Sequence, residues 1–432
     1  MKIISHVRLL ALVVVAWPLA IGAAAGSPAR AAVVVQRRVT AYKKSRIWPS
    51  MPPPGCPFVR SKRLCRIAFT GRYAHYGNSG DTFFPTWASN GNLYTPYADG
   101  WIDGIRAACY LGKKSMAAGL ALVGSNPLKL KITDPEVYPS VPAPYGGRYP
   151  CGSLVYNGVW YYGTYCLTGR SDIRHRGIHY NWPLLGPFVG FRWTRNYGRT
   201  WIQTPCTPAH PLFSENSLKG QPIRIGAPHF VDLGKNLQYS PDGKAYLVAQ
   251  GATDGKSRHF GFDSWITADL VYLLRVKPSI KNMNDATKYQ FFAGRSAHGL
   301  PIWTNNIKGV KPVAAWRGHM GCVTMTYDAP LKTYLMCVTN GMPKPRLGNA
   351  SAFYDTYILE SRRIAGPFRL VSYMRHFGTQ GYFVNIPSKF IAPNGRTMWL
   401  CYSANFCAGE PNPVGSGAGL CLQEIKLLGP EK

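Results

Sequence analysis

The sequence predicts an all-β protein that folds as a five-bladed β-propeller, with four antiparallel strands in each blade. Three observations lead to this class. A two-strand unit recurs five times, its turns are regularly spaced, and almost no segment has the period of a long amphipathic helix. Sheet-sized units that return at a regular spacing are typical of propellers and repeat arrays.

The clearest unit covers residues 226–251. A mostly apolar strand leads to a Ser-Pro-Asp-Gly turn, and a second apolar strand follows. Asp242-Gly243 favours a hairpin turn because glycine adopts a positive φ without steric cost. The flanking residues are rich in Val, Phe and Tyr, as buried strands are.

Four further copies of this unit give the other blades. Their turns lie at Asn90-Gly91, Asn157-Gly158, Asp328 and Asn394-Gly395, so the five turns are 67, 85, 86 and 66 residues apart. An aromatic residue follows each turn. The predicted blades cover residues 71–135, 145–206, 226–305, 311–374 and 377–427.

Residues 194–201, Thr-Arg-Asn-Tyr-Gly-Arg-Thr-Trp, match the Asp-box turn of sugar-active propellers, with Asn196 where Asp is usual. We expect a structural turn, with Trp201 packed between strands and no catalytic role.

The first 31 residues have the form of a secretory signal. Lys2 and Arg8 precede an apolar run at 9–25, and Ala29-Arg30-Ala31 is a suitable cleavage site. A membrane anchor is the alternative, but the run is short and ends in small residues. We expect a protein secreted to the extracellular space or periplasm, with no membrane span after signal removal.

This division leaves two parts of the mature chain. Residues 32–70 form a basic, Pro-rich N-terminal extension that we expect to lie across the propeller, and part of it could complete the last blade. Residues 71–432 form the propeller, which is also the predicted catalytic domain.

The charge balance points to anionic partners. Without residues 1–31 the chain keeps 47 basic and 19 acidic residues, a formal net charge of +28. Such a field favours acidic polysaccharide, nucleic acid or an anionic envelope, although adaptation to an acidic medium or solubility explains it equally well. The basic residues are scattered rather than clustered in runs, so we expect no nucleic-acid partner.

Eleven cysteines in an exported chain suggest disulfides. Cys56–Cys65 could close a small loop, and Cys151–Cys166 could tie the two strands of one hairpin. No cysteine or histidine cluster has the spacing of a zinc site, so we predict no metal ligands.

Propeller geometry selects the candidate binding residues. The starts of the innermost strands ring the central funnel and hold Asp81, Arg148, His229, His319 and Tyr382. The ends of the second strands and the loops after them add Asp99, Asp269 and Asp355, and Asp232 lies on the first strand of blade three. Acids, Arg, His and Tyr that converge on one pocket indicate a site, whereas each acid alone is more often bonded to a neighbouring loop.

Aromatic residues agree with a sugar ligand. Trp87 and Tyr94 lie in the proposed rim segments with Trp160 and Tyr382, and flat rings stack on the apolar faces of sugars. Packing between blades accounts for most of the other aromatic residues.

Several segments resemble a family of five-bladed propeller glycosidases related to the arabinanase, xylosidase and fructosidase propellers. They are Gly-Asp-Thr-Phe at 80–83, residues 87–94, Arg-Tyr-Pro-Cys-Gly-Ser at 148–153, Ala-Pro-His-Phe-Val-Asp at 227–232 and Ile-Pro-Ser-Lys-Phe at 386–390. The resemblance spans about residues 71–425. It implies two carboxyl groups flanking a glycosidic bond, with a third acid to orient or tune.

Carried onto this chain, the resemblance gives Asp99, Asp232 and Asp269 as catalytic candidates. Asp232 or Asp99 would act as base or nucleophile, and Asp269 would act as the acid. Two features depart from the family pattern: Asn90 stands where Asp is expected, and no Glu lies at the third-blade funnel position.

The leading hypothesis is a monomeric glycoside hydrolase that acts on a neutral or anionic polysaccharide or oligosaccharide. Asp81, Trp87, Arg148, His229, His319 and Tyr382 would bind the substrate. One alternative is a polysaccharide lyase for uronic-acid glycans, with Arg148, His229 or His319, and Tyr382 in the catalytic roles. Another is a glycan-binding propeller without activity. No cofactor is required, although a structural calcium ion could fit the channel.

Overall fold

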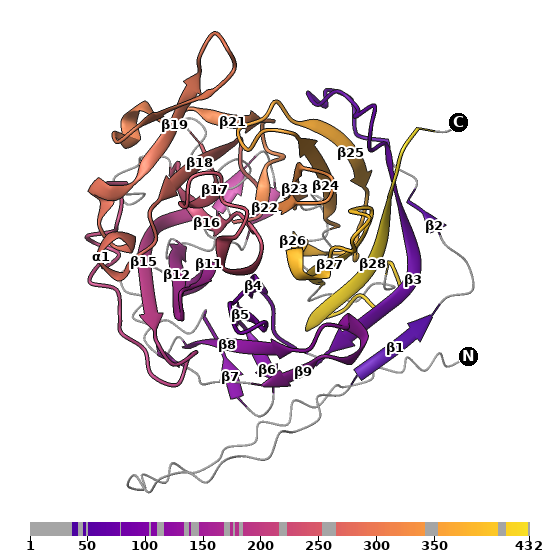
Figure 1. Ribbon diagram of the computed structural model, residues 1–432, viewed down its shortest axis with the longest axis horizontal. Helices are drawn as coiled ribbons and strands as arrows, with labels where there is room; N and C mark the ends of the chain where they lie inside the picture. Colours follow the sequence, from indigo (N-terminus) through magenta and orange to yellow (C-terminus); the bar gives the residue numbers. More distant parts are fainter. Residues whose placement is uncertain are drawn as a thin grey trace, which may run out of the picture. The chain divides into compact units, whose positions relative to one another are not determined.

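Five antiparallel sheets follow one another around a common axis (Figure 1), so the predicted five-bladed propeller is confirmed. The computed structural model describes residues 37–41, 46–48, 51–77, 79–102, 105–109, 116–133, 138–139, 147–167, 173–175, 178–180, 185–215, 223–252, 265–341, 353–404 and 412–430. The predicted signal at 1–31 lies outside these residues.

Blades one and two come first along the chain. In blade one the strands run from the axis outward as β4 (Thr86–Trp87), β5 (Leu93–Tyr97) and β8 (Met116–Val123), and both β9 (Lys131–Thr133) and β10 (Tyr138–Pro139) pair with β8. Blade two consists of β11 (Gly147–Tyr156), β12 (Val159–Leu167) and β15 (Leu185–Thr194). Two hairpins are added, namely β6 (Gly100–Ile102) with β7 (Ile105–Ala107) and β13 (Ile173–His175) with β14 (Ile178–Tyr180).

Blade three is larger than predicted and blade four has the predicted four strands. Blade three contains β16 (Gly226–Phe230), β17 (Ala245–Gly251), β18 (Leu270–Val276), β19 (Gln290–Arg295) and β20 (Pro301–Thr304), and β21 (Pro312–Ala315) pairs with β18. Blade four contains β22 (Gly321–Asp328), β23 (Thr333–Asn340), β24 (Asp355–Ser361) and β25 (Arg369–Met374).

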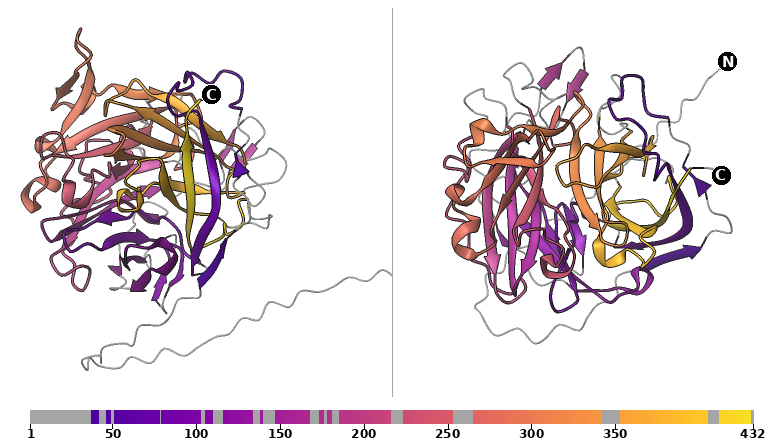
Figure 2. Two further views of the ribbon diagram at one scale, coloured as in Figure 1. Left: turned by 45° about the vertical axis from the view of Figure 1, so that its right-hand side comes forward. Right: turned by 45° about the horizontal axis from the view of Figure 1, so that its top comes forward.

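Blade five joins the two ends of the described chain. It contains β26 (Tyr382–Asn385), β27 (Thr397–Ser403) and β28 (Leu420–Leu428), and the N-terminal strand β3 (Arg66–Tyr76) pairs with β28 (Figure 2). The short strands β1 (Arg37–Ala41) and β2 (Arg46–Ile47) pair with the outer side of β3. β3 therefore crosses the boundary that the sequence placed after residue 70.

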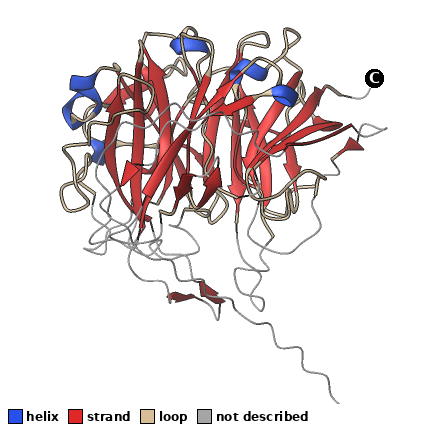
Figure 3. Cartoon of the chain, turned by 90° about the horizontal axis from the view of Figure 1, so that it is seen from below, coloured by secondary structure: helices blue, strands red, loops and turns tan. Residues whose placement is uncertain are grey.

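Helical structure in the described residues is limited to single turns at the edges of the sheets (Figure 3). They are α1 (Ile280–Met283), η2 (Pro127–Lys129), η4 (Lys235–Leu237), η5 (Ala286–Lys288), η6 (Ile307–Gly309) and η8 (Ser388–Phe390). In the part of the chain that the structure describes, no helix is long and apolar enough to cross a membrane.

The predicted Asx-Gly turns lie together at one end of the ring, which we call the turn face. Asn157 and Gly158 both have positive φ, 49° and 74°, as a two-residue hairpin between β11 and β12 requires. In blade three the prediction ran the innermost strand up to Asp242, but β16 already ends at Phe230. The chain leaves the sheet there because its backbone bonds cross to β22 instead.

The opposite end of the ring, where the innermost strands begin, is the start face. Here four of the innermost strands carry a register shift, at Pro150/Ser153, Gly226/His229, Gly321/Thr324 and Tyr382/Asn385. Ala227, Cys322 and Phe383 have φ of 45°, 43° and 51° at these shifts, and Thr82 has 62° at the corresponding place in blade one. Such left-handed non-glycine residues cost about 1–3 kcal/mol each and concentrate at functional sites.

Apolar and aromatic side chains fill the space between the sheets. Between blades one and two, Tyr94, Trp160 and Trp201 pack in one buried cluster, and Trp160 is fully inaccessible. Tyr94 and Trp160 are therefore packing residues and not part of a rim. The Asp-box prediction holds, since Asn196 Oδ1 accepts the Thr200 N–H at 3.0 Å and Trp201 is buried.

None of the ten described cysteines forms a disulfide, so the expected Cys56–Cys65 and Cys151–Cys166 disulfides are absent. In the hairpin of blade two, Cys166 lies opposite Arg148, whereas Cys151 falls within the bulge between Pro150 and Ser153. The bulge thus removes the direct pairing that the disulfide prediction assumed. Cys151 and Cys166 are both buried, and neither forms a disulfide.

Candidate functional site

Asp81 and Tyr382 meet at the start face, although they lie 301 residues apart in the sequence. Each is the residue just before a positive-φ position, Asp81 in blade one and Tyr382 in blade five. The Tyr382 hydroxyl donates a hydrogen bond to Asp81 Oδ2 at 2.5 Å. Because blades one and five are neighbours in the ring, their corresponding positions face each other.

The surroundings of Asp81 favour its protonated form. Burial raises the pKa of the Asp81 carboxyl well above its usual range, and the negative charge of Asp99 raises it further, while hydrogen bonds from Tyr382 and Thr82 oppose the shift. The same burial and the charge of Asp81 raise the pKa of the Tyr382 phenol. A buried carboxyl that keeps its proton can serve as a proton donor.

Asp99 is the second carboxylate at this end of the ring. It lies two residues after the end of β5, and its Oδ1 accepts the Cys109 N–H at 2.6 Å. Asp99 has a φ of 50°, so the chain turns sharply where the carboxylate is presented. Asp81 and Asp99 therefore approach each other from one blade, on either side of the Asp81–Ala98 bridge.

Aromatic rings that the sequence did not single out line the same site. The Trp265 ring centroid lies 5.5 Å from that of Tyr382, and the Tyr354 ring lies 6.2 Å from it. Gln250 fixes this wall, because its amide donates to the Trp265 carbonyl and its Oε1 accepts the Val323 N–H at 3.2 Å. Gly226 and Gly321, at which two of the four register shifts begin, were the available sequence signal for this end of the ring.

Asp269 and His319 lie together at the start face but in a separate, outer group. The Gly318 N–H donates to Asp269 Oδ1 at 2.9 Å, and Asn340 Nδ2 lies 2.7 Å from His319 Nδ1. The ring of Trp316 stacks on His319 with centroids 4.2 Å apart. Burial lowers the pKa of His319, and the charge of nearby Asp355 opposes that shift.

Asp355 is itself fixed by blade four. Its carboxylate accepts the Tyr373 hydroxyl at 2.7 Å and the His376 N–H at 2.8 Å. Asp269 and Asp355 thus both accept hydrogen bonds from backbone N–H groups of adjacent loops. Such a bond to a neighbouring loop is the structural role expected from the sequence as the alternative to catalysis for each acid.

Asp232 lies at the turn face, at the other end of the channel from Asp99. Its carboxylate accepts the Ser388 N–H at 2.7 Å, the Ser388 hydroxyl at 2.7 Å and the Gly234 N–H at 3.0 Å. Its backbone bridges to Thr326, so Asp232 joins blades three, four and five. Burial raises the pKa of Asp232, while these three hydrogen bonds lower it.

Trp87 is also at the turn face, where it lines a small hollow of about 20 Å³ together with Asp232. It therefore lies away from Asp81 and Tyr382. Arg148 lies on β11, but its side chain is outside the described part of the structure.

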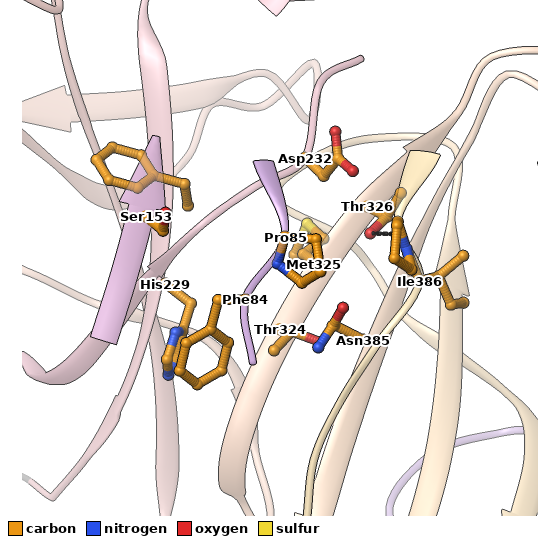
Figure 4. A pocket seen from close by; sticks show the side chains of 12 residues that line it. Phe84, Pro85, Ser153, His229, Asp232, Thr324, Met325, Thr326, Asn385 and Ile386 are labelled. Carbon is orange, nitrogen blue, oxygen red and sulfur yellow. Dashed lines mark hydrogen bonds between the residues drawn. The ribbon is translucent and has the colours of Figure 1, made fainter. Parts of the chain in front are cut away.

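His229 lies between the two faces, in the wall of the central channel (Figure 4). It lines a hollow of about 30 Å³ with Ser153, Asp232, Thr324 and Asn385, and its ring packs on Phe84 with centroids 3.9 Å apart. Neither ring nitrogen has a hydrogen-bond partner among the described residues. Burial lowers the pKa of His229 to about 3, so the imidazole is neutral at ordinary pH.

The structure therefore divides the predicted site. It brings Asp81, Asp99 and Tyr382 together, places Asp269 and His319 in a neighbouring group, and sets Asp232 and Trp87 at the opposite face. The expected trio of Asp99, Asp232 and Asp269 shares no described cavity. Among the described residues, no group of three or more His, Cys, Asp or Glu could hold a metal ion.

Comparisons with known proteins give structural neighbours only. No protein-family model and no curated protein matches the sequence. The fold is similar to a GH43_1 enzyme from Xanthomonas citri complexed with xylotriose, with 12% identity, a TM-score of 0.43, and coverage of 80% of this chain and 86% of that chain.

Two further solved structures are similar over a comparable share of the chain. An α-L-arabinofuranosidase from Podospora anserina in complex with cellotriose has 9% identity and a TM-score of 0.42, covering 81% of this chain and 91% of that chain. An arabinanase from Bacillus subtilis has 13% identity and a TM-score of 0.38, covering 81% and 95%.

Proposed function

We propose that this protein is a glycoside hydrolase whose reaction takes place at the start face, with Asp81 and Asp99 as the reacting carboxyl groups. The observation that carries the proposal is the Asp81–Tyr382 hydrogen bond beside Asp99, at the strained starts of the innermost strands. Two carboxyls with different surroundings are what acid–base cleavage of a glycosidic bond requires.

In this mechanism Asp81 is the general acid, because burial and the charge of Asp99 favour its protonated form. Asp81 gives its proton to the leaving sugar oxygen as the glycosidic C–O bond breaks. Asp99 takes a proton from the water whose oxygen bonds to the anomeric carbon. Tyr382 holds the Asp81 carboxyl in place, and the Trp265 ring offers a flat apolar surface to a sugar.

The test is a screen of neutral and acidic polysaccharides that records both new reducing ends and unsaturated products absorbing in the near ultraviolet. We expect reducing ends without unsaturation. The variant Asp81→Asn should lower kcat by about 10²–10⁴-fold, the usual contribution of a general acid. Its unfolding free energy should stay close to that of the wild type, since Asn retains the size and neutrality of the protonated acid.

Asp355→Asn is the matched control, because Asp355 is an acid of the same face that bonds a phenol in the same way. Full activity of Asp81→Asn would show that Asp81 is not the general acid. An unsaturated product would show that the reaction is β-elimination and not hydrolysis.

A glycan-binding propeller without activity is the second candidate, and one observation favours it. The positions that correspond to Asp81 in blades three and four are Gly226 and Gly321, which carry no reactive group. A Cβ at Gly321 would lie 1.9 Å from the Ile266 carbonyl oxygen, so no acid could stand there. Tight binding of a polysaccharide with no product after days would establish this reading.

Secretion, a monomeric state and the absence of a required cofactor remain part of the proposal. A structural calcium ion also remains a prediction, and it has a simple test. If calcium stabilises the channel, adding a chelator should lower Tm, and adding calcium should restore it.

A further inference from the structure

The outer side of blade four carries a hollow that is separate from the channel. Its lining comes from the segment before β3, which pairs with β25, and from the residues between β24 and β25. Val59 O accepts the Leu370 N–H at 2.9 Å, and the Ser61 N–H donates to Leu370 O at 2.8 Å. Residues 59–61 thus continue the sheet outward, and the hollow lies between this edge and the connection from β24 to β25.

Basic side chains dominate this hollow, whose volume is about 700 Å³. The lining includes five cations, Lys62, Arg63, Arg362, Arg363 and Arg369, and one carboxylate, Glu360. They come from two separate stretches of the chain, so the cluster is not visible as a run in the sequence.

Glu360 does not balance these charges, because its own partners already surround it. Its Oε2 accepts from Arg63 Nη2 at 2.5 Å and its Oε1 accepts from the Ser61 hydroxyl at 2.6 Å. The Glu360 side chain is buried, and its ion pair with Arg63 neutralises its charge. Ser61 also accepts the N–H groups of Arg63 and Leu64, which fixes the shape of this edge.

Four exposed cations remain, Lys62, Arg362, Arg363 and Arg369. None of them takes part in an ion pair of the described residues. Arg363 is held in place, since its Nη1 donates to the Gly299 carbonyl at 3.0 Å. Four like charges in one concave surface repel one another, and an anionic ligand would relieve that repulsion.

We propose that this hollow binds a carboxylated or sulfated polysaccharide, at a place distinct from the start face. Guanidinium groups match carboxylate and sulfate oxygens with paired hydrogen bonds. None of the described residues that line the hollow is aromatic, so they offer no stacking surface to the bases of a single-stranded nucleic acid. The proposal does not depend on hydrolysis, because binding here needs neither Asp81 nor Asp99.

The test compares two variants with equal loss of charge. The first, Lys62→Gln/Arg362→Gln/Arg363→Gln/Arg369→Gln, empties the hollow of its free cations. The control, Lys277→Gln/Lys281→Gln/Lys308→Gln/Lys311→Gln, removes four exposed cations of blade three. Binding of the full chain to size-fractionated polygalacturonate, dextran sulfate and neutral dextran is measured by calorimetry at several salt concentrations.

We expect the wild type to bind one or both anionic probes, with affinity that falls as salt rises, and not to bind neutral dextran. The hollow variant should bind at least about tenfold more weakly at low salt, the effect of losing several charge-assisted contacts, while the control should change about twofold or less. Binding by Asp81→Asn should equal the wild type, which separates this result from the fate of the hydrolase proposal.

Equal weakening of both variants would mean that the general positive field binds the glycan, and it would overturn the proposal. Tighter binding of a single-stranded oligonucleotide of matched charge, lost in the hollow variant, would also overturn it in favour of nucleic acid. The double variant Arg362→Gln/Arg369→Gln serves as a second measurement should the fourfold variant unfold, and it should give a smaller loss in the same direction.

Discussion

The two faces of the propeller differ in how their backbone and acids are used. At the turn face, hairpins such as Asn157-Gly158 adopt conformations that their residues favour, and Asp232 gives its carboxylate to three neighbouring donors. At the start face, Thr82, Cys322 and Phe383 hold left-handed conformations that they disfavour, and Asp81 is buried beside another acid. Under the proposed function, the turn face stabilises the ring and the start face presents the reacting carboxyl groups.

Removing Asp232 should give the largest change in stability. Asp232→Ala leaves the N–H groups of Gly234 and Ser388 and the Ser388 hydroxyl without their acceptor, and we expect a loss of about 3 kcal/mol in the unfolding free energy. Urea unfolding measures it. Activity per folded molecule should stay unchanged. A fall in kcat comparable with that of Asp81→Asn would contradict the assignment of a purely stabilising role to the turn face.

His229 should make the protein lose stability in acid. The folded pKa of His229 is about 3 and its unfolded pKa is about 6.5, so the unfolded chain takes up the proton first as pH falls. Stability is therefore fully present above pH 6.5 and decreases toward pH 3, by about 2 kcal/mol at pH 5.

The measurement is the unfolding free energy between pH 8 and pH 4 for the wild type and for His229→Gln. Between these pH values the unfolding free energy of the wild type should fall with a slope that corresponds to the uptake of up to one proton on unfolding, and the variant should lack this contribution. Identical slopes would show that the ring is protonated within the channel.

Tyr382→Phe should have a moderate effect at the start face. It removes the hydrogen bond that lowers the pKa of Asp81, so that pKa should rise. The alkaline limb of the kcat profile, where the acid loses its proton, should move to higher pH, and kcat should fall about tenfold, or about 1.4 kcal/mol. A purely structural role for Tyr382 would lower kcat without moving the limb.

Alanine at the turn glycines should have the smallest effect. A Cβ at Gly158 would meet no atom within 4 Å, so Gly158→Ala should cost only the strain of its 74° φ, about 1 kcal/mol. A Cβ at Gly395 would lie 2.6 Å from Leu331, so Gly395→Ala should cost more. Thermal unfolding of both variants tests this order, and equal losses would contradict it.

The fold was predictable because its signals are local. Each of four Asx-Gly pairs specifies a turn from two adjacent residues, and these four turns with the one at Asp328 are spaced regularly enough to predict five blades. The exact extent of a strand was not predictable where bonds cross between blades. The Asp232 N–H donates to Met325 O at 2.9 Å, and this contact ends the innermost strand of blade three earlier than the sequence indicated.

The site was predictable only in part, because its geometry depends on contacts between distant residues. Asp81 and Tyr382 were both selected as start-of-strand residues, but nothing local shows that they bond to each other. Asp232 was placed with the catalytic acids because it lies near His229 in sequence. The two residues do line one small hollow, but the Asp232 carboxylate is bound by Ser388, and a contact 156 residues away cannot be predicted from that stretch of sequence.

The pairing of β3 with β28 has a consequence for how the ring is made. β3 is near the beginning of the chain and β28 near its end, so the last blade stays incomplete until almost all residues have been synthesised. Until then β3 exposes an unpaired edge, and closing the ring requires a contact of very high sequence separation. Slow closure, and exchange of β3 between two molecules at high concentration, are the natural failures of such an assembly.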